Sequence, residues 1–238
     1  SLNALSLEMI DLLAPQLAAW ATDDGIAGVI LDSCSDKAFC AGGDVVDLYR
    51  SIRSTPAGQV PERAAAFFER EYRLDHMIHC YPKPLLAWGH GIVMGGGIGL
   101  FAGASHRVVT AKTRFAMPEI TIGLYPDVGG SWFLQRMPGS SGLFLALTGA
   151  PLNASDALFA GLADFALPQD CLPALLDDIV VAGWQGEQQP DSARLDHLLA
   201  RHAAQDLPAS PLQAHLPRID ALIARDTLSQ IAPRLAAL

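Results

Sequence analysis

Short apolar segments, each leading to a loop and then to a helical pattern, recur along the first two thirds of this chain. Residues 26–33 (IAGVILDS), 84–94 (PLLAWGHGIVM) and 106–111 (HRVVTA) have the length and composition of buried strands of the parallel type. Apolar spacing predicts helices over residues 5–20 and 62–80, and a helix with a glycine-rich start over residues 95–104. This order predicts an α/β fold.

The pattern changes near residue 150. Residues 152–162 (LNASDALFAGL) predict a helix that starts at Asn153 or Ser155, and residues 163–167 (ADFAL) predict a short strand. Residues 171–238 are rich in Ala, Leu and Pro and are expected to be helical, with breaks at 185–190 and 206–211. We therefore expect a core over residues 1–170 and a C-terminal helical region over residues 171–238.

Composition excludes several classes of protein. Half of the 238 residues are hydrophobic and 17% are charged, which supports a sizeable buried core. The net charge is −9 and no basic run occurs, so we expect no nucleic-acid partner. No apolar run reaches the ~18 residues of a membrane span, and no His or Cys spacing predicts a metal site. Four reduced and buried cysteines, no signal peptide and a cytoplasmic location are expected, the cysteines being Cys34, Cys40, Cys80 and Cys171.

Two acids lie eight positions apart in residues 117–130 (MPEITIGLYPDVGG). Glu119 and Asp127 each follow a proline directly. Because proline disfavours helix at the preceding residue, we expect both carboxylates on a bent path and not along one helix face. Such a pair can act in acid–base or nucleophilic catalysis. The alternative is structural: Asp127 would cap a helix beginning near residues 129–130, and Glu119 would be exposed.

Two glycine-rich segments offer backbone amides. They are residues 38–45 (AFCAGGDV) and residues 90–100 (HGIVMGGGIGL). Glycine lets a ligand approach the main chain closely, so two loops at neighbouring strand ends could each aim one N–H group at a single oxygen, as in an oxyanion hole. The alternative is tight packing of helix on sheet with ordinary turns. Neither segment has the pattern of a phosphate-binding or dinucleotide-binding loop.

Five segments together resemble the crotonase superfamily, also called the enoyl-CoA hydratase/isomerase family. They cover residues 2–6, 36–45, 84–100, 114–134 and 147–167, so the resemblance spans roughly residues 1–170. It implies the ClpP/crotonase superhelix of ββα units and an acyl-CoA thioester as ligand. It implies no cofactor apart from the coenzyme A of the substrate, and no membrane partner. Many members form trimers or hexamers, so a homo-oligomer is an open expectation.

The resemblance also assigns residues. Gly43 and Gly96 would hold the thioester carbonyl through their amides, and the carbonyl of Ala41 would contact the adenine of coenzyme A. Glu119 matches an acid shared across much of the family. Glu71, within residues 69–78 (EREYRLDHMI), would help to line the acyl pocket.

Two departures point to one branch of the family. Hydratases carry a glutamate where this chain has Gly99, and a small residue where it has Asp127. Compared with hydratases, the chain lacks the acid at position 99, keeps Glu119 and has a further acid, Asp127. This combination resembles the pattern of 3-hydroxyisobutyryl-CoA hydrolases, which are thioesterases of valine degradation. Glu119 would be the nucleophile or the general base for water, and Asp127 would bind the 3-hydroxyl group or orient Glu119 and water. Enoyl-CoA hydration or isomerisation, and a catalytically silent acyl-CoA-binding module, are the alternatives.

The resemblance raises two further points. The family has a strand pair before the segment at residues 2–6, and the subfamily continues with helices beyond the equivalent of Leu238, so we expect a truncated piece. Five apolar residues near the acids could shape a small acyl pocket, although burial in the core is favoured. They are Phe115, Leu124, Tyr125, Trp132 and Phe133.

Overall fold

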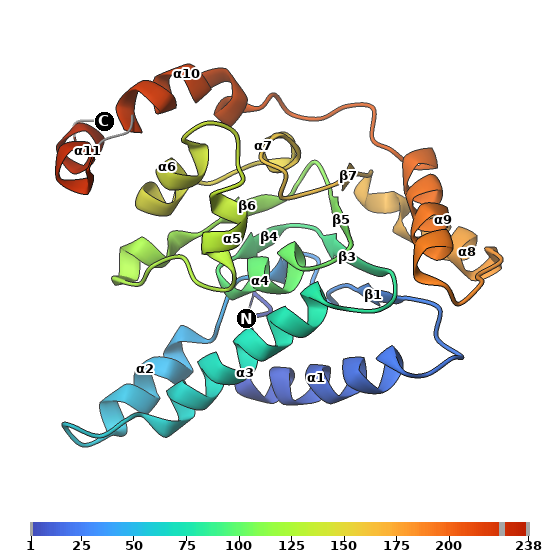
Figure 1. Cartoon of the computed structure of the whole chain (residues 1–238), viewed down its shortest axis with the longest axis horizontal. Helices are drawn as coiled ribbons and strands as arrows, with labels where there is room; N and C mark the ends of the chain where they lie inside the picture. The colour runs from blue at the N-terminus through green and yellow to red at the C-terminus, as the bar shows by residue number, and fades with distance from the viewer. Residues whose placement is uncertain (1, 224–226, 237–238) are drawn as a thin grey trace.

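Two small parallel sheets form the centre of the protein in a computed structural model, which describes residues 2–223 and 227–236 (Figure 1). The strands of each sheet pair only in parallel. In spatial order, the first sheet contains β1 (Val29–Leu31), β3 (Leu85–Gly89), β5 (His106–Val109) and β7 (Phe165–Ala166). The second contains β2 (Ala38–Cys40), β4 (Ile92–Met94) and β6 (Arg114–Ala116).

The chain passes from the first sheet to the second within each unit. β1, β3 and β5 lie in the first sheet and are followed by β2, β4 and β6 in the second, before the chain turns to helices. The single strand predicted over residues 84–94 is therefore wrong. Gly91 has φ +60°, and a side chain there would collide with the carbonyl of Lys37, so the backbone turns between β3 and β4. Likewise, the segment 36–45 contains β2 where only a loop was expected.

Helices surround the two sheets. Those of the N-terminal two thirds are α1 (Leu7–Ala21), α2 (Val45–Ser54), α3 (Glu62–His79), α4 (Gly96–Ala102), the 3-10 turn η1 (Pro118–Ile122), α5 (Gly130–Leu134), α6 (Ser141–Thr148) and α7 (Ala154–Phe159). α1 packs along α3, and α2 and α3 project together from the body (Figure 1). Asn153, one of the two starts expected from the sequence, caps α7 and accepts from the Asp156 amide.

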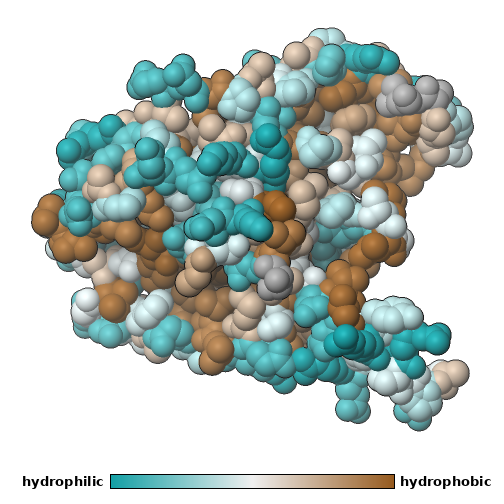
Figure 2. Space-filling view, turned by 180° about the vertical axis from the view of Figure 1, so that it is seen from behind, coloured by the Kyte–Doolittle hydropathy of each residue, from teal (hydrophilic) through white to brown (hydrophobic). Residues whose placement is uncertain are grey.

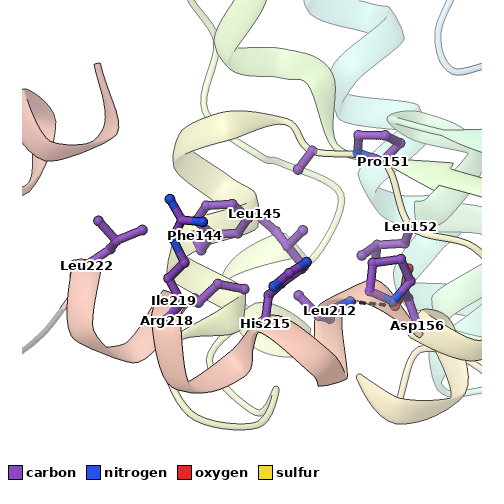
Figure 3. Close-up of a pocket in the computed structure, with 12 residues that line it drawn as sticks. Phe144, Leu145, Pro151, Leu152, Asp156, Leu212, His215, Arg218, Ile219 and Leu222 are labelled. Carbon is purple, nitrogen blue, oxygen red and sulfur yellow. Dashed lines mark hydrogen bonds between the residues drawn. The ribbon is translucent and has the colours of Figure 1, made fainter. Parts of the chain in front are cut away.

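The C-terminal part is helical in the region that the structure describes. After the 3-10 turn η2 (Gln169–Cys171) come α8 (Leu172–Val181), α9 (Gln188–Arg201), α10 (Pro211–Ile223) and α11 (Leu228–Leu235). α8 and α9 bury Leu175 and Leu199 against Trp88 of β3. α10 packs on α6 and α7, where the Leu212 amide donates to Asp156. A cavity of about 370 Å³ lies between α6 and α10 and is lined mainly by apolar side chains. Figure 3 shows the residues that line it.

Buried apolar side chains from both sheets and from the helices form the hydrophobic core. Trp88, Phe101 and Phe115 are its largest fully buried side chains. Among the described helices none has both the length and the apolar character needed to cross a membrane. All four cysteines are free, as expected, but the prediction that all are buried is wrong, because Cys34 and Cys80 are exposed.

Candidate active site

Two glycine-rich loops meet beside the start of α4. The ideal position of a Cβ atom on Gly96 lies 3.4 Å from the amide nitrogen of Gly43. The bridge between Leu5 and Gly43 uses the carbonyl of Gly42 and the amide of Asp44, so it does not engage the N–H group of Gly43. Gly96 is the first residue of α4, and its amide therefore has no acceptor within that helix. The structure thus brings together the two amides that the sequence singled out.

Glu71 lies against the same glycine. The side chain comes from α3 and is only 2% exposed. Its Oε1 occupies the space that a side chain on Gly96 would need. Burial raises the pKa of Glu71 to about 9, and the charges of Asp75, Asp127 and Glu119 act in the same direction. Glu71 is therefore protonated and uncharged at neutral pH.

Glu119 also lies close to the glycine-rich start of α4. It lies in η1 and is 6% exposed, so the alternative of an exposed Glu119 is wrong. Its Oε1 lies 3.0 Å from the position of a Cβ atom on Gly95, and its Oε2 has no hydrogen-bond partner among the described residues. Burial raises the pKa of Glu119 to about 7, and the negative charge of Asp127 also raises it. A backbone hydrogen bond lowers the pKa but does not offset these two effects. Glu119 can thus take or give a proton near neutral pH.

Asp127 is held by a tyrosine from α3. The hydroxyl of Tyr72 donates to Oδ2 of Asp127 across 2.7 Å. The alternative in which Asp127 caps a helix is wrong, because α5 has Gly129 as its N-cap and no side-chain cap. Gly129 has φ +83°, a conformation that suits glycine at this turn. The side chain of Asp127 is therefore directed to α3 and not to the helix that follows it.

A cavity of about 780 Å³ lies between α3, α4 and the segment around α5. Asp127 lines it, together with three of the five apolar residues expected near the acyl group: Tyr125, Trp132 and Phe133. Burial in the core was favoured for all five, and this is wrong for Tyr125 and Trp132, which are 68% and 54% exposed. Arg136 stacks on the Trp132 ring, with its Cζ 3.2 Å from the centroid. Phe115 is fully buried, as expected.

Asp75 belongs to this group of acids, although it lies in none of the glycine-rich or proline–acid motifs of the sequence. It lies one turn after Glu71 on α3, and it lines the cavity with Asp127. Both of its carboxylate oxygens are shielded from solvent and have no hydrogen-bond partner within residues 2–223 and 227–236. Burial raises the pKa of Asp75 well above its usual range, and the charge of Asp127 contributes. The spacing of four residues from Glu71, on a predicted helix, was the available signal.

The remaining predicted site residue is Ala41. It follows β2 directly and precedes Gly42 and Gly43, so it belongs to the same loop as one of the two amides. Its contact with adenine stays a prediction. Within the described part of the chain, no group of His, Cys, Asp and Glu side chains has an arrangement that could hold a metal ion.

The central features are therefore two paired loop amides and buried acids beside them. The family model described as enoyl-CoA hydratase/isomerase matches residues 1–238, and the chain belongs to this family. A carnitinyl-CoA dehydratase from Mycobacterium thermoresistibile is 40% identical, with a TM-score of 0.86 over 98% of this chain and 64% of that one. An enoyl-CoA hydratase from Rhodobacter sphaeroides is 34% identical, with a TM-score of 0.79 over 100% of this chain and 64% of that one. The expected crotonase-type fold is confirmed.

Curated relatives extend the comparison. The mitochondrial 3-hydroxyisobutyryl-CoA hydrolase of Xenopus tropicalis is 41% identical over 99% of this chain and 60% of the relative. The human protein of the same name is 36% identical over 98% of this chain and 59% of the relative. The small ribosomal subunit protein mS47 of Neurospora crassa is 43% identical over 73% of this chain and 34% of the relative. The chain thus spans about 60% of the length of these hydrolases.

The names of these relatives correct one expectation. Both hydrolases are named as mitochondrial proteins, which contradicts the cytoplasmic location expected from the sequence. Composition and the first residues of a chain do not report the compartment of a folded protein.

Proposed function

We propose that the protein hydrolyses acyl-CoA thioesters, with 3-hydroxyisobutyryl-CoA as its substrate. The observation that carries this proposal is the position of Glu119, whose buried carboxyl group has an unpartnered oxygen close to the loops that contain Gly43 and Gly96. The names of the hydrolase relatives support the choice of substrate. Gly99 also supports it, because this position lacks the acid that hydratases of the family carry.

The two amides would hold the thioester carbonyl oxygen. When a nucleophile adds to the carbonyl carbon, negative charge develops on this oxygen, and two N–H donors fixed in advance stabilise it. Removing one such donor from an enzyme raises the barrier by about 3 kcal/mol. Glu71 supports this role of the amides. Because its pKa is about 9, it is neutral at pH 7 and places no negative charge beside Gly96.

Glu119 would supply the nucleophile in one of two ways. Its carboxylate could attack the thioester carbon, releasing coenzyme A and forming a mixed anhydride that water then cleaves. Alternatively, it could take a proton from a water molecule that attacks the same carbon. Both routes need the ionised form, and a pKa of about 7 makes that form available at neutral pH while keeping the group basic.

Asp127 and Tyr72 form the outer part of the proposed site. The hydrogen bond between them fixes the Asp127 carboxylate at the wall of the cavity. From there its charge raises the pKa of Glu119. We assign Asp127 the role of keeping Glu119 basic and of orienting water.

A two-substrate assay tests the proposal. The protein is offered 3-hydroxyisobutyryl-CoA while free thiol is followed, and crotonyl-CoA while the enoyl absorbance is followed. The proposal predicts thiol release with the first substrate and no rapid hydration of the second. Hydration without thiol release would point to a hydratase. Binding of both thioesters with neither reaction would point to the silent acyl-CoA-binding module.

A further inference from the structure

The carboxyl group of Asp75 fills a space that three parts of the fold leave between them. Its Oδ2 lies 2.7 Å from the ideal Cβ position of Gly99 on α4, and the Cβ atom of Val128 lies 2.7 Å from the same point. Asp75 therefore lies between its own helix, α4 and the chain that directly follows Asp127. A Cβ atom at position 99 would force Asp75 or Val128 to shift.

This carboxyl group has no evident structural partner. Neither of its oxygens is exposed to solvent or hydrogen-bonded among the residues that the structure describes. A buried polar group without a partner is destabilising, so proteins seldom keep one unless a ligand or water binds it. In its neutral form the group offers one O–H donor and several acceptor sites. These requirements match a hydroxyl group, which both donates and accepts.

Asp75, which contacts Gly99, lies about one turn of α4 beyond the paired amides. Gly99 lies three residues after Gly96, which corresponds to a rise of about 4.5 Å along the helix. A thioester whose carbonyl oxygen is held at Gly43 and Gly96 would extend its acyl group past this helix turn. Its third carbon, two bonds beyond the carbonyl carbon, would then reach the level of Asp75.

We propose that Asp75 binds the hydroxyl group on the third acyl carbon and thereby selects 3-hydroxyacyl thioesters over acyl thioesters that lack it. This inference rests on the proposed function, because it assumes an acyl-CoA ligand with its carbonyl at the two amides. Binding of the 3-hydroxyl group is one of the roles that the resemblance implies for Asp127. The inference assigns this role to Asp75, because Oδ2 of Asp127 already accepts the hydroxyl of Tyr72.

The test compares binding of two ligands in the absence of turnover. In the Glu119→Gln protein, dissociation constants are measured for 3-hydroxyisobutyryl-CoA and for isobutyryl-CoA, which differ by one hydroxyl group. One neutral hydrogen bond predicts a preference of roughly tenfold for the hydroxylated ligand. Asp75→Leu should reduce this ratio to about one. Asp75→Asn keeps a donor and an acceptor and should retain most of the preference.

Controls separate selection from a structural role. Glu69→Leu, on the same helix, removes an exposed acid paired with Arg73 and should leave the ratio unchanged. Asp75→Leu should also unfold at a higher temperature, because it removes a buried polar group without a partner. If Asp75→Leu does not fold, Asp75→Ala provides the same comparison.

Two results would overturn the inference: no preference for the hydroxylated ligand in the Glu119→Gln protein, or an unchanged preference in Asp75→Leu or Asp75→Ala. Thiol release by the protein with Glu119 intact is measured separately. Its absence would refute the hydrolase function, whereas a lost preference in the Asp75 variants would still support the role of Asp75 in binding.

Discussion

Oδ2 of Asp75 lies 2.7 Å from the position that a Cβ atom on Gly99 would take. One helix turn earlier, Oε1 of Glu71 stands in the same relation to Gly96. Two acids four residues apart on α3 thus fit against two glycines three residues apart on α4. This contact explains Gly96 and Gly99 of α4, because each leaves room for a carboxyl group, whereas Gly97 leaves room for the backbone of Cys40.

This contact predicts the effect of a methyl group on α4. Gly99→Ala should lower the free energy of unfolding by about 1–3 kcal/mol, because its Cβ atom would overlap with Asp75 and Val128. In a double-mutant cycle, Asp75→Gly should restore part of the loss, with a coupling energy above about 0.5 kcal/mol. Urea unfolding measures all four proteins. Gly183→Ala is the control, since its Cβ atom meets only the end of the flexible Arg194 side chain, at 3.2 Å.

The dependence of kcat/KM on pH should be bell-shaped. The lower limb should rise through about pH 7, where Glu119 loses its proton and becomes active. The upper limb should fall above about pH 9, where Glu71 ionises and places negative charge beside Gly96. Thiol release is measured from pH 5 to 10 after subtraction of the uncatalysed rate. In Glu71→Gln the fall near pH 9 should disappear, and a fall that persists would assign it to another group.

Glu71 should also make the stability of the folded protein depend on pH, with less stability at higher pH. The pKa of Glu71 is higher in the folded protein than in the unfolded chain, so the folded state binds more protons between about pH 4.5 and 9. The stability associated with Glu71 is therefore fully present below pH 4.5 and is lost as the pH rises toward 9. Glu71→Gln should raise the melting temperature by at least about 2–4 °C at pH 9, and by less at pH 5. An equal change at both values would contradict a buried, protonated Glu71.

A pair of tyrosines separates activity from stability. Tyr72→Phe removes the hydrogen bond to Asp127 and should lower kcat/KM about tenfold, while stability changes little because Tyr72 is 38% exposed. Tyr81→Phe removes a buried hydrogen bond to the carbonyl of Leu17 and should cost about 1 kcal/mol of stability without changing kcat/KM. Kinetics and thermal unfolding are measured on both variants. The opposite pattern would place Tyr72 outside the working site.

Sequence patterns predicted the elements that depend on local spacing. The helix over α3 and the cap at Asn153 follow from apolar periodicity and cap chemistry, which are local properties. The division of residues 84–94 into β3 and β4 did not follow from the apolar run, because both halves are equally apolar. The turn depends on the close approach of Gly91 to the carbonyl of Lys37, which is far away in sequence.

The residues of the candidate site also divide into those that the sequence predicts and those that it does not. Glu119 and the two glycine loops were selected because prolines and repeated glycines are conspicuous in the sequence. The spacing of Asp75 from Glu71 places both on one face of a predicted helix but does not indicate burial, because the burial involves the contact with Gly99, 24 positions away. The exposure of Tyr125 and Trp132 was also missed, because their surroundings are set by the cavity between α3, α4 and α5 and not by composition.

In the proposed function, Glu119 carries out thioester hydrolysis beside the paired amides of Gly43 and Gly96. The most direct test is thiol release from 3-hydroxyisobutyryl-CoA by the protein and by Glu119→Gln, with ligand binding and melting temperature measured on both. We expect kcat to fall by about 10²–10⁴ in Glu119→Gln, while the dissociation constant changes little and the fold is kept. Undiminished thiol release by a folded Glu119→Gln protein would contradict it.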